Sequence, residues 1–353
     1  MAPNTAAFFT GVQAPLEVRP ADSPKPDANE VVVKAKAVAI NPVDYAMQIM
    51  GPSVFKWLNP PCVFGEDVAG EVAEVGSAVT KVKAGDRVAG LTNTAFQHEV
   101  VIKEHLLIPI PASLPYENAA VMPLGLSVAV KGLFHKDFLN LRLPSLNAKP
   151  AGETVLIWGA STSVGSNAVQ LAAAAGYEVI TTASPANFEL TKKLGASQVF
   201  DYHSPTIKED LISAFRGKKS PGAFCNGGPA PPTHPPVIAA CKAVLQATDG
   251  RKFLALTMAT PPGEMPEGFI SKFVSPLEGD EELASAIFGE YLPQALTAGK
   301  YMPTPKAKVV GHGLESIQRA MDTLKQGVSV ERGHRPDAPL RGSPHRFLLG
   351  AVL

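Results

Sequence analysis

The stretch LIWGASTSVGSNAVQ, residues 156–170, begins like a buried strand and ends like a helix, with a turn rich in Gly and Ser between them. The apolar run at 154–158 is typical of a strand buried on both faces of a parallel sheet. Apolar residues then recur at helical spacing, and they are Val164, Ala168, Leu171, Ala172 and Ala175. A strand, a turn and a helix in this order can hold a phosphate, because the first amides and the dipole of the helix attract an anion.

The turn departs from the dinucleotide fingerprint G-x-G-x-x-G, since it has Gly159, Thr162 and Gly165 at the marked places. Gly159 supplies the tight turn and Gly165 allows the helix to pack on the sheet. Ser161, Thr162 and Ser163 add hydroxyl donors where the middle glycine would lie. A plain turn between any strand and helix would have the same composition, so the motif leaves both interpretations open.

Strand and helix signals continue to alternate beyond this turn. YEVITTA (177–183) and SQVFDY (197–202) read as strands, and ANFELTKKL (186–194) reads as the helix between them. Ser184 suits the helix N-cap and Pro185 the first helical position. Alternation of this kind predicts βαβ units and a parallel sheet.

The end of the second strand predicts which dinucleotide binds. An NAD site usually has Asp or Glu there, to bind the ribose 2′-hydroxyl. No acid precedes Glu189 in TTASPAN, and a 2′-phosphate would meet Ser184, Asn187 and the first amides of the helix. The sequence therefore favours NADPH over NADH, and Lys192 and Lys193 could assist.

Composition limits the classes of partner. The 353 residues suffice for two domains, and the 32 basic and 32 acidic side chains balance, which gives no bias toward nucleic acid or an anionic membrane. No apolar run approaches the ~20 residues of a membrane span. The cysteines are isolated at 62, 225 and 241, which fits reduced thiols in a cytoplasmic protein.

Three segments lack this alternation of strand and helix signals. Residues 1–123 contain short β-branched runs broken by glycines, which predicts a β-rich region. The proline-rich segment 226–237 predicts a surface loop that is not helical until after Pro236. The segment after Gln326 is rich in Arg, Pro and Gly, which predicts a poorly ordered or unusually packed tail in which FLLGAVL (347–353) could replace a strand.

Several motifs carry a family resemblance. AINPVDYAMQ (39–48), GEDVAGEVAEVG (65–76), GDRV (85–88) and IPASLPYENAAVMPLG (110–125) precede the nucleotide fold in the order seen in the medium-chain dehydrogenase/reductases. The chain resembles their zinc-free branch, and STSV (161–164) with SPAN (184–187) resembles fungal trans-acting enoyl reductases and ToxD-like proteins.

The resemblance implies an α/β protein with a GroES-like β-rich catalytic domain and a Rossmann domain of doubly wound parallel-sheet type. It implies a GroES-like part at 1–123, an NADPH-binding Rossmann domain at 124–285, and a return to the catalytic domain at 286–353. The implied phosphate and adenosine contacts are Ser161, Thr162, Ser163, Val164, Ser184, Pro185, Ala186, Asn187 and Tyr202. Those at the nicotinamide end are Val43, Asp44 and Tyr45, and those where cofactor and substrate meet are Gly125, Leu126 and Ser127.

The resemblance also implies a protein without metal. Zinc-dependent relatives have a cysteine ligand where this chain has Asn41 and a histidine ligand where it has Glu66. A catalytic zinc site needs three protein ligands of Cys, His or carboxylate type. Without zinc to polarise a carbonyl, an acceptor that is already electrophilic is favoured.

Three functions remain open at this point. The first is NADPH-dependent reduction of an activated double bond, as in an enoyl group that is free or tethered to an acyl carrier of a polyketide synthase. The second is reduction of a quinone, and the third is a non-catalytic NADPH-binding partner, which the tail, the proline-rich segment and Val128 suggest. For the first, Tyr45 is a candidate proton donor, although it could instead be an aromatic wall with water as the donor.

Overall fold

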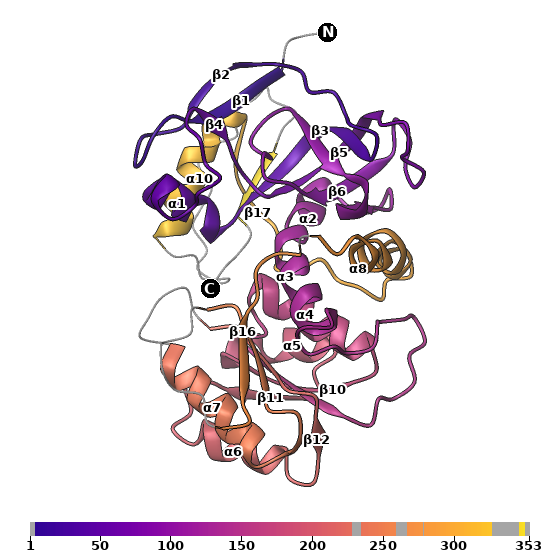
Figure 1. The fold of residues 1–353 in the computed structure, drawn as a ribbon, viewed down its shortest axis with the longest axis vertical. Coiled ribbons are helices and arrows are strands. Elements are labelled where there is room, and N and C mark those ends of the chain that lie inside the picture. The colour runs from indigo at the N-terminus through magenta and orange to yellow at the C-terminus, as the bar shows by residue number, and fades with distance from the viewer. Residues whose placement is uncertain (1–3, 228–233, 259–266, 278, 327–345, 350–353) are drawn as a thin grey trace. The chain divides into compact units, whose positions relative to one another are not determined.

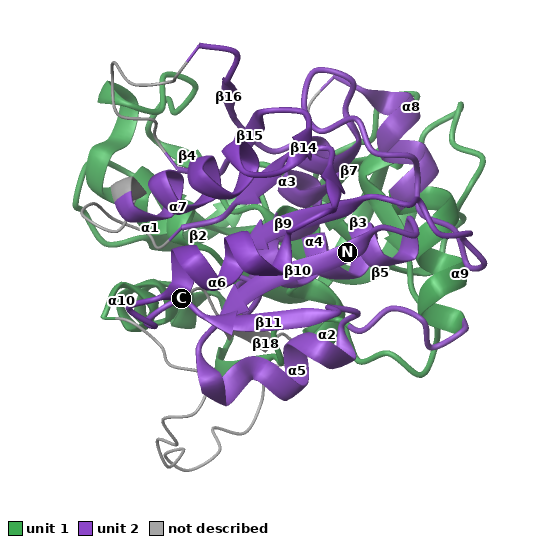
Figure 2. Ribbon diagram, turned by 90° about the horizontal axis from the view of Figure 1, so that it is seen from below, with its two compact units in different colours: residues 1–124, 288–297, 303–353 green, residues 125–287, 298–302 purple. Residues whose placement is uncertain are grey.

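The structure is a computed structural model that describes residues 4–227, 234–258, 267–277, 279–326 and 346–349. The chain forms two compact units (Figure 2). Unit 1 comprises residues 1–124, 288–297 and 303–353, and unit 2 comprises residues 125–287 and 298–302. The domain boundaries predicted from the sequence, at 1–123, 124–285 and 286–353, stay predictions.

Unit 2 contains a parallel sheet of six strands in the order β11-β10-β9-β13-β15-β16 (Figure 1). Numbered along the chain within the sheet, this order is 3-2-1-4-5-6, which is the order of the doubly wound dinucleotide-binding fold. The strands are β9 (Thr154–Trp158), β10 (Glu178–Ala183), β11 (Gln198–Asp201), β13 (Ala223–Cys225), β15 (Phe253–Leu256) and β16 (Ile270–Phe273). A short parallel pair joins β12 (Lys219–Ser220) and β14 (Asp249–Gly250).

Helices cover both faces of this sheet. Alternate strand residues such as Leu156 and Cys225 pack with α6 and α7 in one buried cluster. On the other face, Gly132 of α3 lets that helix approach Phe224, because a Cβ there would lie 2.2 Å from the phenyl ring. The helices associated with unit 2 are α3 (Pro123–Phe134), α4 (Ser163–Ala174), α5 (Phe188–Lys193), α6 (Ile207–Ala214), α7 (His234–Gln246) and α8 (Glu281–Ala284).

The proline-rich segment differs from its prediction. Residues 228–233 lie outside the described residues, but α7 begins at His234, two residues before Pro236. A helix tolerates proline in its first turn, since the N–H that proline lacks has no acceptor there. The prediction that no helix precedes Pro236 is therefore wrong.

Unit 1 is built from two sheets. One has the order β2-β1-β4 and the other has the order β17-β18-β3-β5-β6-β8, with β7 also paired to β3. The strands are β1 (Asn4–Phe9), β2 (Glu17–Ala21), β3 (Glu30–Ile40), β4 (Cys62–Val63), β5 (Asp67–Val75), β6 (Arg87–Leu91), β7 (Glu99–Lys103), β8 (Leu107–Pro109), β17 (Lys308–His312) and β18 (Arg346–Leu349). The helices are α1 (Pro42–Met50), α2 (Tyr116–Ala120), α9 (Leu292–Thr297) and α10 (Ile317–Lys325).

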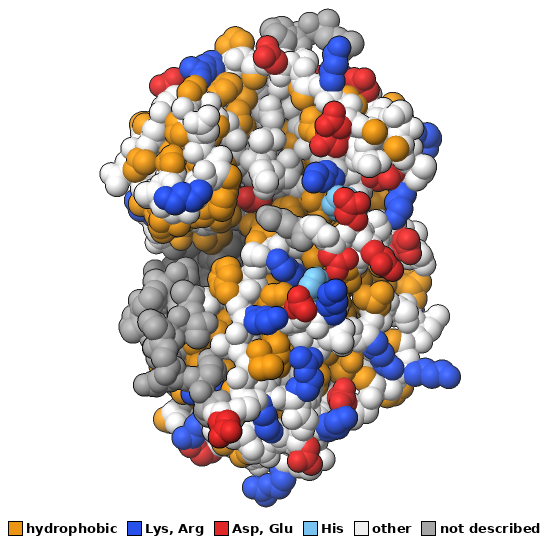
Figure 3. All heavy atoms as spheres, viewed as in Figure 1, with side chains coloured by type: hydrophobic (Ala, Val, Ile, Leu, Met, Phe, Trp, Pro, Cys, Tyr) orange, Lys and Arg blue, Asp and Glu red, His pale blue; other side chains and the backbone are white. Residues whose placement is uncertain are grey.

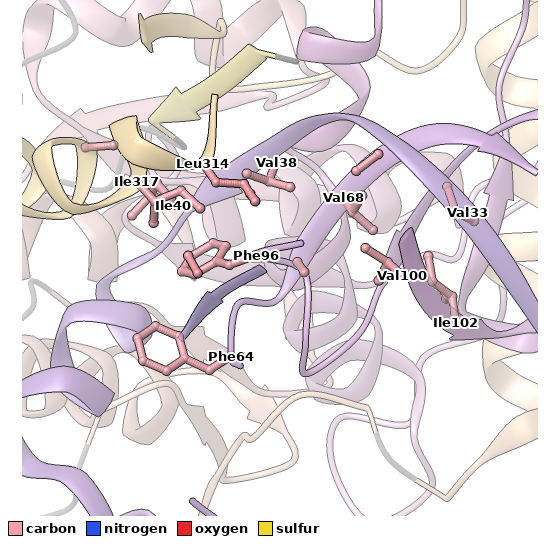
Figure 4. Close-up of a cluster of buried hydrophobic side chains, with 14 of the residues drawn as sticks. Val33, Val38, Ile40, Phe64, Val68, Phe96, Val100, Ile102, Leu314 and Ile317 are labelled. Carbon is pink, nitrogen blue, oxygen red and sulfur yellow. The ribbon is translucent and has the colours of Figure 1, made fainter. Parts of the chain in front are cut away.

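The C-terminal return completes unit 1. Leu314 and Ile317 are buried with Ile40 in the core that also holds Phe64 and Phe96, whose ring centroids are 5.5 Å apart (Figure 4). Strand β18 lies between β17 and β3 and is parallel to β3. The expectation that FLLGAVL forms a strand is confirmed for residues 347–349, whereas residues 350–353 and the predicted disorder at 327–345 lie outside the described residues.

Among the described residues, none of the helices combines the length and apolar content that a membrane span requires. Basic and acidic side chains are interspersed over the face shown in Figure 3.

Candidate functional site

The turn after β9 lies where the strand order of unit 2 reverses. Strand β10 is on one side of β9 and β13 is on the other. In open α/β sheets, ligands bind outside the carboxyl ends of the strands at this reversal. The first amides of α4 lie there, and they have no acceptor within the helix.

Two glycines give this turn its shape. Gly159 has φ +82°, and a Cβ there would lie 2.3 Å from Asn226 O. A Cβ at Gly165 would lie 2.0 Å from Gly159 O. The positive φ confirms the tight turn predicted at Gly159, and the close approach at Gly165 confirms the packing role predicted for that glycine.

Thr162 is the N-cap of α4. Its Oγ1 accepts from Gly165 N at 2.9 Å and donates to Gly159 O at 3.0 Å, and it also accepts from Asn226 Nδ2. The hydroxyl proton thus goes to a carbonyl of the protein and is not offered to a ligand, contrary to the expectation of three outward hydroxyl donors. The other predicted phosphate contacts stay predictions. They involve the start of α4 and were assigned to Ser161, Thr162, Ser163 and Val164.

The second predicted cluster, for the 2′-phosphate, comes together at the same edge of the sheet. Ala183 of β10 pairs with Asp201 of β11, so the next residues, Ser184 and Tyr202, emerge on neighbouring strands. Ser184 occupies the N-cap position of the following turn, as predicted, but its side chain makes no capping hydrogen bond; its Oγ accepts from Asn187 Nδ2 at 2.9 Å. Pro185–Asn187 form one 3-10 turn before α5.

The end of β10 is free of acidic side chains. The first acid after it, Glu189, is exposed and pairs with Lys192 at 3.2 Å. Lys193 is also exposed. The predicted preference for NADPH depends on the lack of an acidic residue directly after β10, and the structure agrees with this feature.

The start of α3 touches the start of α4. A Cβ at Gly125 would lie 2.3 Å from Ser163 Oγ, so only glycine allows this approach. Leu126 is buried, and the Oγ of buried Ser127 accepts from Leu277 N at 2.7 Å. The structure thus gives Gly125 and Ser127 packing roles beside the turn, and their predicted contact with substrate stays a prediction.

In unit 1, α1 carries the residues predicted for the nicotinamide end. Val43 and Tyr45 are half-buried and pack against the hydrophobic core of the unit. Asp44 is fully buried at the third position of the helix. The packing of Tyr45 supports its interpretation as a wall.

Asn41 connects α1 to two carboxylates. Its backbone N–H donates to Asp44 Oδ2 at 2.6 Å, and its Nδ2 donates to Asp67 Oδ2 at 2.9 Å. The other oxygen of Asp67 accepts from Leu124 N, in the first turn of α3, at 2.6 Å. This Asn41–Asp44–Asp67 network joins β3, α1, β5 and the start of α3.

The two carboxyl groups of the network are buried. Burial raises the pKa of Asp67 to about 7, against the lowering effect of the bonds from Asn41 and Leu124. Burial raises the pKa of Asp44 well above its usual range, and the nearby Glu66 and Asp67 add to the increase. Asp44 Oδ1 has no hydrogen-bond partner among the described residues.

The described residues contain no group of three or more His, Cys, Asp or Glu that could hold a metal ion. The carboxylates instead accept hydrogen bonds from the protein. Absence of metal stays a prediction to be tested by elemental analysis.

Two residues of the phosphate turn were missed by the sequence interpretation. Asn226 directly follows β13, and Thr257 directly follows β15. Thr257 Oγ1 donates to Asn226 Oδ1 at 2.7 Å. A polar residue at the end of a buried apolar run, as in AFCN and FLAL-T, is the signal that could have identified both.

Known proteins were compared with this chain. Residues 27–112 match the family model of the alcohol dehydrogenase GroES-like domain. Dehydrogenase azaJ of Aspergillus niger is 47% identical over 94% of this chain and 98% of its own length. Trans-enoyl reductase himH of Aspergillus japonicus is 37% identical over 90% of this chain and 92% of its own length.

The fold is shared with solved structures. The mycobacterial protein Rv1454c complexed with NADPH superposes with a TM-score of 0.65 at 22% identity. The match covers 92% of this chain and 96% of that protein. Both units therefore have counterparts in one known architecture.

Proposed function

This chain belongs to the medium-chain dehydrogenase/reductase family, and from that premise we propose that it is an NADPH-dependent reductase of an activated carbon–carbon double bond. It is an oxidoreductase with a GroES-like domain and a Rossmann domain, and its relatives indicate a nicotinamide cofactor. The single observation that carries the proposal is the segment after β10, where Asn187 is bonded to Ser184 and no acid occurs before Glu189. Asp201, which pairs with Ala183 from the neighbouring strand, accepts from His203 N at 3.0 Å.

The residues of unit 2 fit a phosphorylated dinucleotide. The glycine turn brings backbone close to the sheet edge, and the start of α4 offers amides to a pyrophosphate. Beside β10, the Ser184 hydroxyl and the Asn187 amide offer neutral donors to a 2′-phosphate. Ser184 is neutral, whereas an acidic residue at this position would repel the 2′-phosphate.

The acceptor proposed is an enoyl group or another α,β-unsaturated carbonyl. Relatives with this name include himH, which is called a trans-enoyl reductase. The carboxylates near Asn41 are bonded within the protein, so the residues favour an acceptor that needs no metal to polarise it. When bound, the cofactor supplies a hydride, and Tyr45 and Val43 would form the wall that orients it.

Nucleotide titration tests the cofactor. Wild-type protein is expected to bind NADPH more tightly than NADH, and Ser184→Asp to reverse this preference, since a carboxylate repels the 2′-phosphate. The control is Ser213→Asp, which adds the same charge at an exposed position in the last turn of α6. Retention of the preference by Ser184→Asp would overturn the assignment.

Acceptor assays test the reaction. Purified protein with NADPH is expected to reduce the crotonyl thioester of N-acetylcysteamine faster than it reduces a benzoquinone. Faster quinone reduction would establish the alternative of a quinone reductase. Tight NADPH binding without turnover of either acceptor would establish a non-catalytic partner protein.

The same assay tests the physiological form of the substrate. We propose a cytoplasmic enzyme that acts on an enoyl group carried by a polyketide synthase, as the term trans-enoyl reductase in its relatives suggests. A crotonyl group on an acyl carrier protein is then expected to give a lower KM than the free thioester. Equal KM values would indicate a free substrate.

A further inference from the structure

A closed set of hydrogen bonds lies directly beneath the phosphate turn. Its side chains are Thr162 from the turn, Asn226 from the end of β13 and Thr257 from the end of β15. Thr162 and Asn226 are buried. The three residues come from segments that are far apart in the sequence, and they meet at the reversal of strand order.

The direction of each bond in this set is determined. Thr162 Oγ1 gives its one proton to Gly159 O at 3.0 Å and accepts from Gly165 N at 2.9 Å. Asn226 must therefore present its Nδ2 to Thr162, because that hydroxyl has no second proton to donate. Its Oδ1 then faces Thr257 Oγ1, which donates at 2.7 Å.

Backbone bonds support the same arrangement. Asn226 N donates to Trp158 O at 3.2 Å, and Thr257 N donates to Cys225 O at 3.1 Å. The carbonyl of Asn226 also limits the turn, since a Cβ at Gly159 would meet it. The ends of β9, β13 and β15 are thus tied side to side below the start of α4.

We propose that Asn226 and Thr257 are positioning residues for the dinucleotide, acting through Thr162. In the usual fingerprint a middle glycine lets the pyrophosphate approach the turn. Here a threonine occupies that region, and Asn226 holds its hydroxyl inward so that the helix amides keep their direction. The inference rests on the proposed NADPH site and adds residues that only orient it.

The test measures NADPH affinity by titration of the full-length chain. Thr257→Val removes one hydroxyl, frees Asn226 to rotate, and is expected to weaken NADPH binding about tenfold, which corresponds to one hydrogen bond in the set. Thr257→Ser restores the hydroxyl and should restore the affinity. The KM for the acceptor should not change in either variant, whereas a general loss of structure would alter it.

A matched control separates positioning from stability. Thr248 is a buried threonine of the same unit, and its Oγ1 donates to Val244 O at 2.7 Å in α7. Thr248→Val therefore removes a comparable buried bond away from the turn and should leave NADPH affinity unchanged. If it weakens binding as much as Thr257→Val does, loss of stability explains both and the inference is wrong.

A double-mutant cycle tests the path through Asn226. Thr162→Val and Thr257→Val each break one side of the set. The double mutant should therefore lose less NADPH affinity than the sum of the two single losses. Wild-type affinity in Thr257→Val would overturn the inference and leave the proposed function standing. Failure of the wild-type chain to bind NADPH would overturn the proposed function, and this inference with it.

Discussion

Asn41 in unit 1 and Asn226 in unit 2 each follow a buried strand and fasten the start of a helix, but they bond to different chemistry. Asn226 meets two hydroxyls, and every donor in that set has an acceptor within the protein. Asn41 meets two carboxylates in a buried place, and Asp44 Oδ1 has no hydrogen-bond partner among the described residues. The hydroxyl set is complete without any charge, whereas the carboxylate network must carry either a negative charge or a proton.

This difference should make the carboxylate network of unit 1 sensitive to pH, whereas the hydroxyl set of unit 2 contains no group that titrates in this range. Burial raises the pKa of Asp67 to about 7 in the folded chain, and an unfolded aspartate titrates near 3.9. Between these values the folded chain holds a proton that the unfolded chain has lost. Stability from this group is complete below about pH 4 and is lost as pH rises toward about 7.

The largest expected effect follows from that sign. Between about pH 4 and pH 8 the wild-type free energy of unfolding should fall by about 3 kcal/mol more than that of Asp67→Asn. The asparagine keeps the bond from Leu124 and can pair with Asn41 after an amide flip. Urea unfolding across this pH range measures the difference, and parallel curves for the two proteins would contradict the role of Asp67.

Removal of the donor should have a somewhat smaller effect. Asn41→Leu leaves Asp67 Oδ2 buried without its side-chain donor and should cost about 2 kcal/mol at pH 8. At pH 5 the cost should be smaller, because protonated Asp67 needs that donor less. An equal loss at both values in urea unfolding would mean that packing, and not the charged bond, explains the change.

The hydroxyl set provides the opposite case. Thr162→Val removes the N-cap of α4 and should cost about 1 kcal/mol at every pH. Thr162→Ser retains the Oγ and should recover most of this loss. A pH-dependent cost, measured by the same unfolding series, would remove the distinction between the two networks.

The smallest effect is expected at Tyr45, which packs against the hydrophobic core of unit 1. Tyr45→Phe should change stability by less than about 0.5 kcal/mol. If the ring is a wall, kcat should fall about twofold at most, whereas a positioned acid typically contributes ~10²-fold. Steady-state rates in water and deuterium oxide distinguish the two, since only a lost donor changes the solvent isotope effect.

The sequence predicted well what depends on local pattern. β9 coincides with the strand predicted at 154–158, and α4 follows the turn where the apolar spacing predicted a helix. The family resemblance also located the β-rich unit. These features depend on neighbours in the chain, which a single sequence displays.

The missed features depend on residues that meet only in the fold. Thr162 looked like a phosphate ligand because Asn226, 64 positions away, could not be placed beside it. Asp67 was read as part of a motif, and its bond to Leu124 joins residues 57 positions apart. The start of α7 at His234 was missed for a local reason. The prolines at 235 and 236 were expected to exclude a helix, although a first helical turn tolerates proline.

Strand β18 has a consequence for the way the chain is made. It lies between β17 and β3 in one sheet, so β3 gains its parallel neighbour only when residues 346–349 have been synthesised. Until then residues 37–40 of β3 have no neighbour on that side, since β7 pairs only with residues 30–34, and an unpaired strand edge is the kind that recruits other chains. During translation, holdase chaperones would therefore have a reason to bind residues 37–40 for longer than any segment of the Rossmann sheet, whose last strand ends at Phe273.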